Sequence, residues 1–180
     1  DNFSNSKSQL KAGRNYSVEQ LIEAMIIDSD NVAKDLLLDY ADRDTLYQLF
    51  GDLDIELPDA KTPDDKYYGI SVKTYSLFFR TLYNSTILNR NDSEKALQLL
   101  SKTTFKTGII AGIPENIAVA HKFGAHVSPP IGNELHDCGI IYYPQKPYLL
   151  CVMTRGRDAN KLALVITNIS KSVFEFIKNN

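Results

Sequence analysis

The sequence has no excess of either charge and no long apolar run. Its 180 residues include 20 basic and 22 acidic side chains, a formal net charge of -2, so no basic patch marks a protein that binds nucleic acid or an anionic membrane surface. No apolar stretch approaches the roughly 20 residues that a membrane span needs. No His, Cys and Glu residues have the spacing of metal ligands, and we expect no cofactor. With 43% hydrophobic residues, the chain should fold as a globular domain.

Cysteine is also scarce. The two cysteines, Cys138 and Cys151, lie in neighbouring apolar runs that we expect to form a hairpin. If the hairpin turns about Gln145 and Lys146, Cys138 lies opposite Met153 and the two thiols are diagonal neighbours. Such neighbours are about 7 to 8 Å apart, which is beyond disulfide range. This register predicts free, buried cysteines, whereas a shifted register would place them opposite each other. The cysteines therefore do not determine the redox compartment of the protein.

The first part of the chain has helical patterns. Residues 1–15 are polar and should form an arm or loop. Ser17 and Gln20 make a capping box before a helix that should end at Asp28. Further helices are expected after a cap at Asp30 or Asn31, from Asp42 to a stop at Gly51, after a cap at Ser71, and after a cap at Asp92 or Ser93. The acidic segment from Asp52 to Gly69 should form a long loop, a length that is often functional.

The pattern changes after Gly112. Runs at 117–125, 135–143 and 148–154 predict a three-stranded antiparallel meander. Asp158 or Asn160 should cap a final helix with one apolar stripe, formed by Leu162, Val165, Ile166, Ile169, Val173, Phe176 and Ile177. The prediction is one α+β domain over 16–180, mainly helical over 16–116, with the sheet and covering helix over 117–180. The sheet keeps open edges, so an upstream segment or another chain, such as a homo-oligomer partner, should complete it.

Two short motifs could carry chemistry. Ser29-Asp30-Asn31 separates two helices, where these residue types are favoured as caps, but the Ser29 hydroxyl and Asn31 amide could also project into a cleft. Lys122-Phe123-Gly124 falls on the first predicted strand. Gly124 indicates close approach of a backbone or ligand, and Lys122 shares its strand face. One face thus offers a charge and an uncrowded backbone.

Together these motifs resemble those of the class A β-lactamase and penicillin-binding serine hydrolase superfamily. The pattern includes Val32-Ala33 and Leu36-Leu37 after the first motif, Gly139-Ile140-Ile141 on the next strand, and a long C-terminal helix. The separation of the motifs, 122 − 29 = 93 residues, is of the order that the family shows. The resemblance implies a bacterial, extracytoplasmic hydrolase, secreted, periplasmic or on the cell surface. Its reaction would be acyl transfer through a serine ester on a β-lactam or peptide-like amide.

The resemblance also implies the site residues. Ser29 would be the proton-relay serine, and Lys122 would bind the substrate carboxylate and tune Ser29. Asn31 would contact the substrate amide and brace an active-site lysine. On the strand, Gly124 would adjoin the substrate, and the backbone N–H of Ala125 would be half of an oxyanion hole.

The family's nucleophile is missing from this pattern. It is the serine of Ser-x-x-Lys at the start of a helix well upstream of Ser-Asp-Asn. The matches here, Ser4 to Lys7 and Ser8 to Lys11, are polar in context and too close to Ser29. A start at Asp1 suggests a processed or trimmed chain. We therefore expect the nucleophile to lie outside this chain, which should be inactive as given.

Other departures concern the loop and the strands. The segment from Asp52 to Gly69 lacks the Glu-x-x-Leu-Asn with which class A β-lactamases activate the deacylating water. Four of its acidic residues are predicted to be solvated loop charges: Glu56, Asp59, Asp64 and Asp65. Phe123 replaces a hydroxyl residue, and Cys138 stands where many class A enzymes have an arginine. A literal Lys106-Thr107-Gly108 follows a helix and is interpreted as a chance match.

Three hypotheses remain open from the sequence. Carboxylate binding would depend on Lys122, with His121, His126 or His136 as helpers. A non-catalytic relative could instead bind cell-wall peptide or a protein partner. A structural interpretation makes both motifs caps and strand residues only, and it predicts that Ser29 and Lys122 are turned apart or act as caps.

Overall fold

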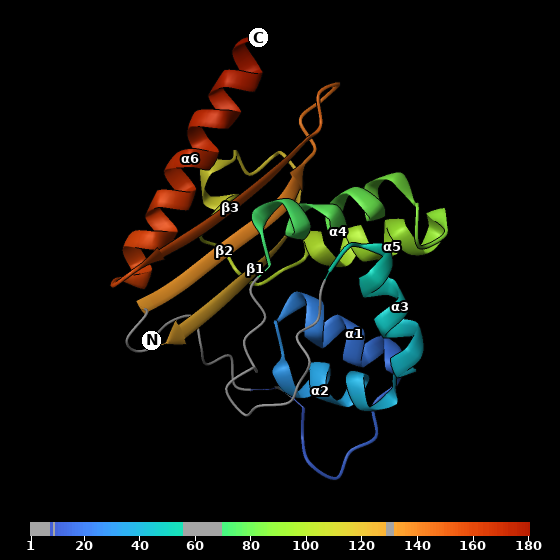
Figure 1. Ribbon diagram of the computed structural model, residues 1–180. Helices are drawn as coiled ribbons and strands as arrows, with labels where there is room; N and C mark the ends of the chain where they lie inside the picture. Colours follow the sequence, from blue (N-terminus) through green and yellow to red (C-terminus); the bar gives the residue numbers. More distant parts are fainter. Residues whose placement is uncertain (1–7, 9, 56–69, 129–131) are drawn as a thin grey trace.

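The computed structural model describes residues 8, 10–55, 70–128 and 132–180. Helices fill the first part of the chain, and the sheet and its covering helix follow (Figure 1). The elements are α1 (Val18–Ile27), α2 (Asn31–Tyr40), α3 (Arg43–Asp52), α4 (Val72–Asn84), α5 (Arg90–Ser101), the short 3-10 helix η1 (Ile110–Gly112), β1 (Val119–Ser128), β2 (Gly132–Ile141), β3 (Tyr148–Gly156) and α6 (Ala159–Asn179). The predicted α+β order, with a meander and a C-terminal covering helix, is confirmed.

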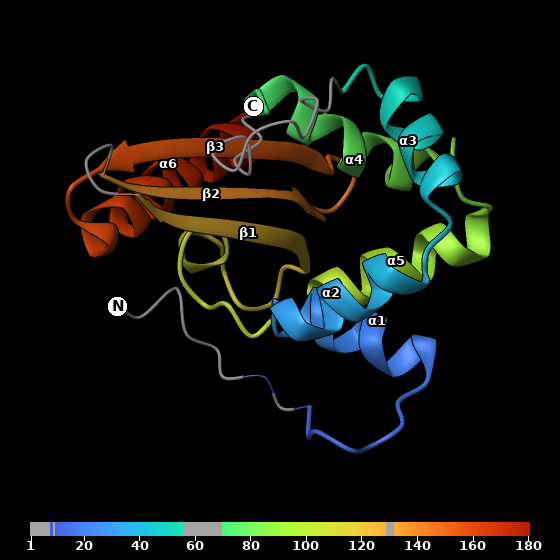
Figure 2. The ribbon, with the colours of Figure 1, turned by 60° about the horizontal axis from the view of Figure 1, so that its bottom comes forward.

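The described strands form one antiparallel sheet in the order β1-β2-β3, with a helical layer on each face. On one face, α6 and the segment around η1 enclose a core that includes Leu135, Ile141 and Ile166. On the other face, α4 and α5 contribute Phe79 and Leu100 to a second core. Figure 2, turned from the first view, shows the sheet between these layers, with α1 and α2 beyond the β1 edge. Within the described chain, no helix is long and apolar enough to cross a membrane.

Side-chain caps explain most helix starts. The Ser17 capping box before α1 is formed as predicted, and Asp30, Ser71 and Asp158 cap α2, α4 and α6. Each cap satisfies N–H groups that the first helical turn leaves open.

Two helix boundaries differ from the prediction. Helix α3 runs past Gly51 and ends at Asp52, since this glycine has an ordinary helical backbone and no positive φ. Helix α5 is capped by Asn89, three residues before Asp92; the Asn89 side chain accepts from the Asp92 N–H. Several polar residues in a row offer alternative caps, and packing selects among them.

The predicted register of the β2–β3 hairpin is wrong. Pro144 and Gln145 form the turn, and Gln145 has φ of 65°, which fits proline at the second and positive φ at the third position of a type II turn. The turn is centred one residue earlier than expected, so the pairing shifts by two residues. Cys138 therefore lies opposite Cys151, and the two form a disulfide in place of the free thiols predicted.

The apolar stripe of α6 is also corrected. The residues that α6 buries against the sheet are Leu162, Ala163, Ile166, Ser170 and Phe174. Val165, Ile169 and Phe176, which the sequence assigned to the buried stripe, are 45%, 38% and 65% exposed. The packed face includes two small residues, Ala163 and Ser170, and at the second of them α6 lies close to η1: the Ser170 hydroxyl donates to the Ile109 carbonyl at 2.8 Å.

Replacing Gly112 with alanine should destabilise the fold. A Cβ at Gly112 would lie 2.6 Å from the Thr167 carbonyl oxygen and 2.7 Å from the Lys171 nitrogen, both backbone atoms of α6. Neither can move without displacing the helix, so we expect a loss of about 1 to 3 kcal/mol of unfolding free energy, measured by urea denaturation. The control is Gly51→Ala, where nothing lies within 4 Å of the new Cβ. Equal stability of both variants would contradict this packing.

Candidate active site

The segment between α1 and α2 presents the Ser29 hydroxyl. The N–H groups of Asp28 and Asp30 both donate to the Ala24 carbonyl, at 3.1 and 3.2 Å, so the chain doubles back at Ser29, whose φ is 57°. This left-handed conformation is unfavourable for serine. Asp30 is buried and caps α2 by accepting the Ala33 N–H at 3.0 Å. The capping interpretation is therefore correct for Asp30 and leaves the Ser29 side chain available for another contact.

The end of α1 is tied to the chain that leads into β1. The Ile27 carbonyl accepts the Thr104 N–H at 3.0 Å and the Thr103 hydroxyl at 3.3 Å. These bonds lie two residues before Ser29, so they fix its position relative to the sheet.

Lys122 reaches Ser29 from β1. The Lys122 Nζ donates to the Ser29 Oγ and lies 3.3 Å from the Phe123 carbonyl oxygen. From the helical layer, the Tyr75 hydroxyl donates to the Lys122 backbone carbonyl at 2.9 Å. Two residues 93 positions apart in sequence thus meet, which contradicts the structural interpretation in which they turn away from each other.

Burial shifts the pKa of both the Lys122 amine and the Tyr75 hydroxyl. It lowers the pKa of the Lys122 amine from 10.5 to about 8, opposed by the negative charge of Asp137. Burial also raises the pKa of the Tyr75 hydroxyl, and Asp137 adds to that effect. Tyr75 therefore remains a neutral hydrogen-bond donor, while Lys122 is a cation whose proton is held less tightly than that of an exposed lysine.

The opposite face of β1 carries a buried polar cluster. His121 Nδ1 and Asp137 Oδ1 lie 2.9 Å apart, and both side chains are fully buried. The other Asp137 oxygen accepts the Ile109 N–H at 2.8 Å. Beside them, Phe123 stacks on Phe105 with ring centroids 4.0 Å apart. Phe123 thus packs in the core, and His121 does not reach the Lys122 side of the strand.

The literal Lys106-Thr107-Gly108 has a structural role. It lies before η1 and outside the strands, and Lys106 Nζ donates to the Thr103 carbonyl at 2.7 Å. Gly108 has φ of 72°, and a Cβ there would lie 2.5 Å from Asp137 Oδ2. Glycine is required because the buried carboxylate occupies the space.

The remaining predicted site residues differ in their exposure and in their neighbours. Asn31 is the exposed first residue of α2. Gly124 has open space beside it, with only His136 at 4.0 Å from an added Cβ, and Ala125 pairs with Leu135. Cys138, opposite Lys122, is fully buried and bonded to Cys151.

Neither Ser-x-x-Lys match is supported as a nucleophile. Ser8 and Lys11 lie outside any helix, and the Ser8 hydroxyl accepts the Leu10 N–H at 3.1 Å. Ser4 and Lys7 lie outside the described residues, as do four acidic side chains of the predicted loop, Glu56, Asp59, Asp64 and Asp65. In the described part of the chain, no group of three or more His, Cys, Asp or Glu could hold a metal ion.

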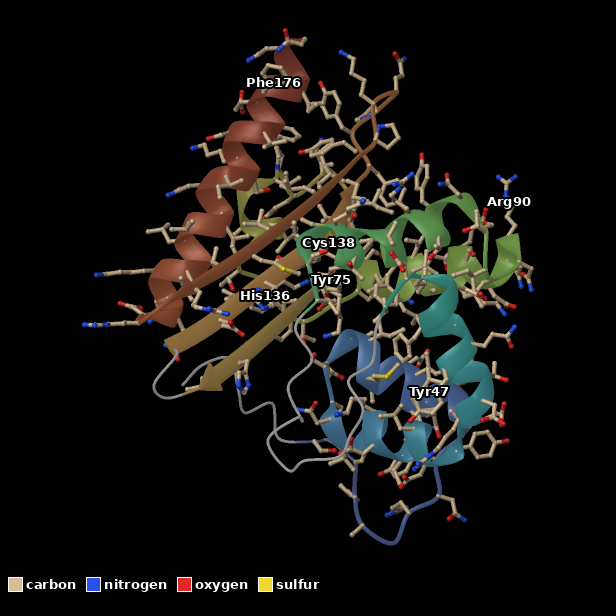
Figure 3. All side chains as sticks on the ribbon, viewed as in Figure 1. Tyr47, Tyr75, Arg90, His136, Cys138 and Phe176 are labelled. Atoms are coloured by element: carbon tan, nitrogen blue, oxygen red, sulfur yellow. A yellow bond between two sulfur atoms is a disulfide. The ribbon has the colours of Figure 1, made fainter. Side chains whose placement is uncertain are left out.

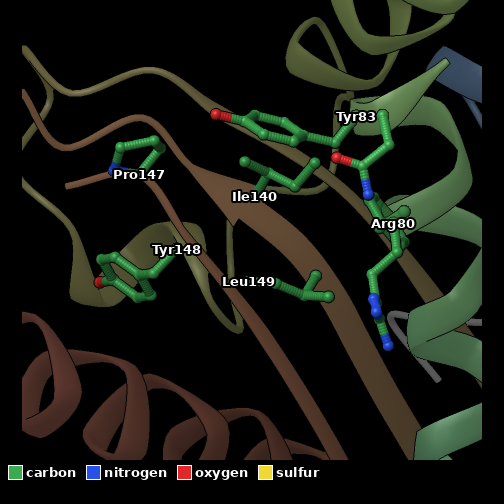
Figure 4. A pocket seen from close by; sticks show the side chains of 8 residues that line it. Arg80, Tyr83, Ile140, Pro147, Tyr148 and Leu149 are labelled. Atoms are coloured by element: carbon green, nitrogen blue, oxygen red, sulfur yellow. The ribbon is translucent and has the colours of Figure 1, made fainter. Parts of the chain in front are cut away.

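A cavity of about 200 Å³ lies between α4 and the β2–β3 turn (Figure 4). It is lined by Phe79, Arg80, Tyr83, Asn84, Ile140, Pro147, Tyr148 and Leu149. Neither Ser29 nor Lys122 lines it. The cavity is therefore separate from the contact that the two motifs make.

Sequence reasoning missed the roles of Tyr75 and Asp137 in this region, and it named His136 only as one of three possible helpers of Lys122. Nothing in the sequence shows that the Tyr75 hydroxyl donates to the backbone of β1. Asp137 lies in an apolar run, where a lone carboxylate was a signal of a buried polar contact. His136 projects from β2 on the side of the sheet that α4 covers, the side on which Cys138 also lies (Figure 3).

The α+β fold belongs to the β-lactamase-like class of structure. The sequence model of the Beta-lactamase enzyme family matches residues 4–177, and the chain belongs to this family. No curated protein matches it. Among solved structures, PBP-A is 20% identical with a TM-score of 0.77, over 95% of this chain and 65% of that chain.

Two class A β-lactamases are similarly close in fold. A W229D mutant of the last common ancestor of Gram-negative bacteria class A β-lactamase is 23% identical, with a TM-score of 0.75, over 92% of this chain and 67% of that chain. TLA-1 extended-spectrum β-lactamase is 18% identical, also with a TM-score of 0.75, over 89% of this chain and 64% of that chain. The chain thus spans about two thirds of the length of these structures.

Proposed function

We propose that this chain is the part of a bacterial, extracytoplasmic serine hydrolase that supplies proton relay and substrate binding. The reaction is acyl transfer through a serine ester on a β-lactam or peptide-like amide. The observation that carries the proposal is the Lys122 Nζ to Ser29 Oγ hydrogen bond between two motifs far apart in sequence. The cross-strand disulfide supports an oxidising compartment.

Each group has a role that its chemistry permits. The Lys122 ammonium binds the substrate carboxylate and polarises the Ser29 hydroxyl, which passes a proton to the leaving nitrogen when the amide bond breaks. A lysine with a lowered pKa suits this relay because it exchanges protons near neutral pH. Asn31 contacts the substrate amide, Gly124 leaves room for the substrate, and the Ala125 N–H helps to stabilise the oxyanion.

The attacking serine is proposed to lie outside residues 1–180. The described residues Ser8, Leu10 and Lys11 lie outside any helix, so Lys11 is not held one helical turn from Ser8 as the family's chemistry requires. The alternative is a non-catalytic relative that keeps the cleft for cell-wall peptide or a partner protein. The absence of a helical Ser-x-x-Lys from the described residues favours this alternative for the chain by itself.

Labelling with a fluorescent penicillin tests the proposal. We expect the 1–180 polypeptide to remain unlabelled, because none of its described serines lies in a helix with a lysine three residues later. A longer form of the protein that adds upstream sequence should label stoichiometrically, at a serine outside 1–180. Gel fluorescence and peptide mapping measure both results.

Two variants serve as controls for this labelling. Label on Ser4 or Ser8, lost in Ser4→Ala or Ser8→Ala, would place the nucleophile inside the chain and contradict the proposed division. If a longer form that contains a helical Ser-x-x-Lys stays unlabelled over long incubation, the non-catalytic alternative replaces the hydrolase.

A further inference from the structure

The structure separates the three histidines. His121 is fully buried against Asp137 on the α6 side of the sheet. His126 lies opposite Glu134 toward the end of β1, whereas His136 lies directly opposite Gly124. Because alternate residues of a strand share a face, and Lys122 pairs with Cys138, His136 projects on the same side of the sheet as Lys122 and Gly124.

The space around His136 is suited to a ligand. On β1 its neighbour is bare backbone: an added Cβ on Gly124 would meet only the His136 Cδ2, at 4.0 Å. The His136 Nδ1 is enclosed and has no hydrogen-bond partner among the described residues. An oxygen that enters over Gly124 would therefore meet the other ring nitrogen, Nε2, which is bonded to the Cδ2 atom that borders Gly124.

The charged and titratable groups near His136 come from three elements. Burial lowers the pKa of the His136 imidazole, and Arg155 on β3 acts in the same direction, while Glu134 on β2 and a contact with the Leu135 backbone oppose them. Arg155 and Glu134 are themselves paired at 2.5 Å, which reduces the effect of each. On β1, Lys122 adds a positive charge to the same face. Free His136 is therefore neutral at pH 7 and would gain a proton only beside an anion.

We propose that His136 is a specificity-determining residue, which together with Lys122 binds the carboxylate of an acyl substrate above Gly124. This inference rests on the proposed function and extends it. The carboxylate is the group that faces both nitrogen-bearing side chains, and its binding is coupled to uptake of one proton by the His136 ring. The class of ligand is an anionic lactam or a peptide with a free carboxylate, in preference to its neutral ester.

Nuclear magnetic resonance of the 1–180 polypeptide tests the proposal directly. Benzylpenicillin is the probe, and its methyl ester is the matched neutral control. We expect benzylpenicillin to move the His136 ring signals and raise the His136 pKa, whereas the ester leaves both unchanged. The Kd for benzylpenicillin should fall between pH 7.5 and 5.5 by up to about tenfold for each unit by which the carboxylate raises that pKa. The carboxylate stays ionised throughout this range.

Variants distinguish His136 from its neighbours. His136→Gln should abolish the pH dependence of the Kd, while His126→Gln, which changes the histidine opposite Glu134, should retain it. A His136 signal that stays still while benzylpenicillin binds would overturn the proposal, as would no binding at any pH. Both outcomes are independent of penicillin labelling of a longer form, so failure of this subsite is distinguishable from failure of the hydrolase proposal.

Discussion

Lys122→Met is expected to reduce the rate of acylation by fluorescent penicillin, in a form of the protein that labels, on the order of 100-fold. The substitution keeps the length and apolar stem of the side chain but removes the charge that contacts the Ser29 hydroxyl. A hydrogen bond to a charged group contributes about 1.5 to 3 kcal/mol, and loss of the relay adds to loss of substrate binding. The control is Lys146→Met in the exposed β2–β3 turn. Equal acylation rates for both variants would contradict the role of Lys122.

Although Lys122→Met should slow acylation, it should raise the unfolding free energy at pH 7. The folded chain holds the Lys122 proton less tightly, with a pKa of about 8 against 10.5 for the ordinary side chain. Between these values the unfolded chain binds more protons, so the unfolding free energy of the wild type should rise with pH from about 8 to 10.5. At pH 7 the charge is buried at full cost, and Lys122→Met should be more stable than the wild type in urea. The Lys146→Met control should keep the wild-type slope in this pH window.

Asp137→Asn is expected to reduce the unfolding free energy by about 1.5 to 3 kcal/mol, the range for a hydrogen bond to a charged group. Its two carboxylate oxygens meet the Ile109 N–H and the His121 ring. An asparagine amide has only one oxygen, so its NH₂ group would face one of these partners in a fully buried site. Urea denaturation at pH 7 measures the loss.

An exposed carboxylate provides the comparison. Asp39→Asn on α2 removes a charge that the structure leaves exposed, and its stability should stay within about 0.5 kcal/mol of the wild type. The Asp137 charge also counteracts the burial of Lys122, so Asp137→Asn should lower the Lys122 pKa further. If Asp137→Asn and Asp39→Asn have equal stability, the buried cluster does not hold β1 and β2 together as we infer.

Some features of the fold were predictable because their causes are local. The Ser17 capping box and the Ser71 cap each involve residues three positions apart. The strand-forming runs are likewise recognised from the residue types of a few successive positions. The prediction was wrong where neighbouring polar residues compete, as at Asn89 and Asp92. It was also wrong at the β2–β3 turn, where one residue of error moved Cys138 from Met153 to Cys151.

The sequence by itself determined the α+β order and the two motifs whose spacing resembles the β-lactamase family. The tertiary structure alone decided that Lys122 reaches Ser29, that His121 contacts Asp137 on the opposite face of the sheet, and that His136 shares the face of Lys122. These contacts join residues 93 and 16 positions apart or lie across paired strands. They depend on strand register and helix packing, because a shift of one residue turns every side chain of a strand to the opposite face.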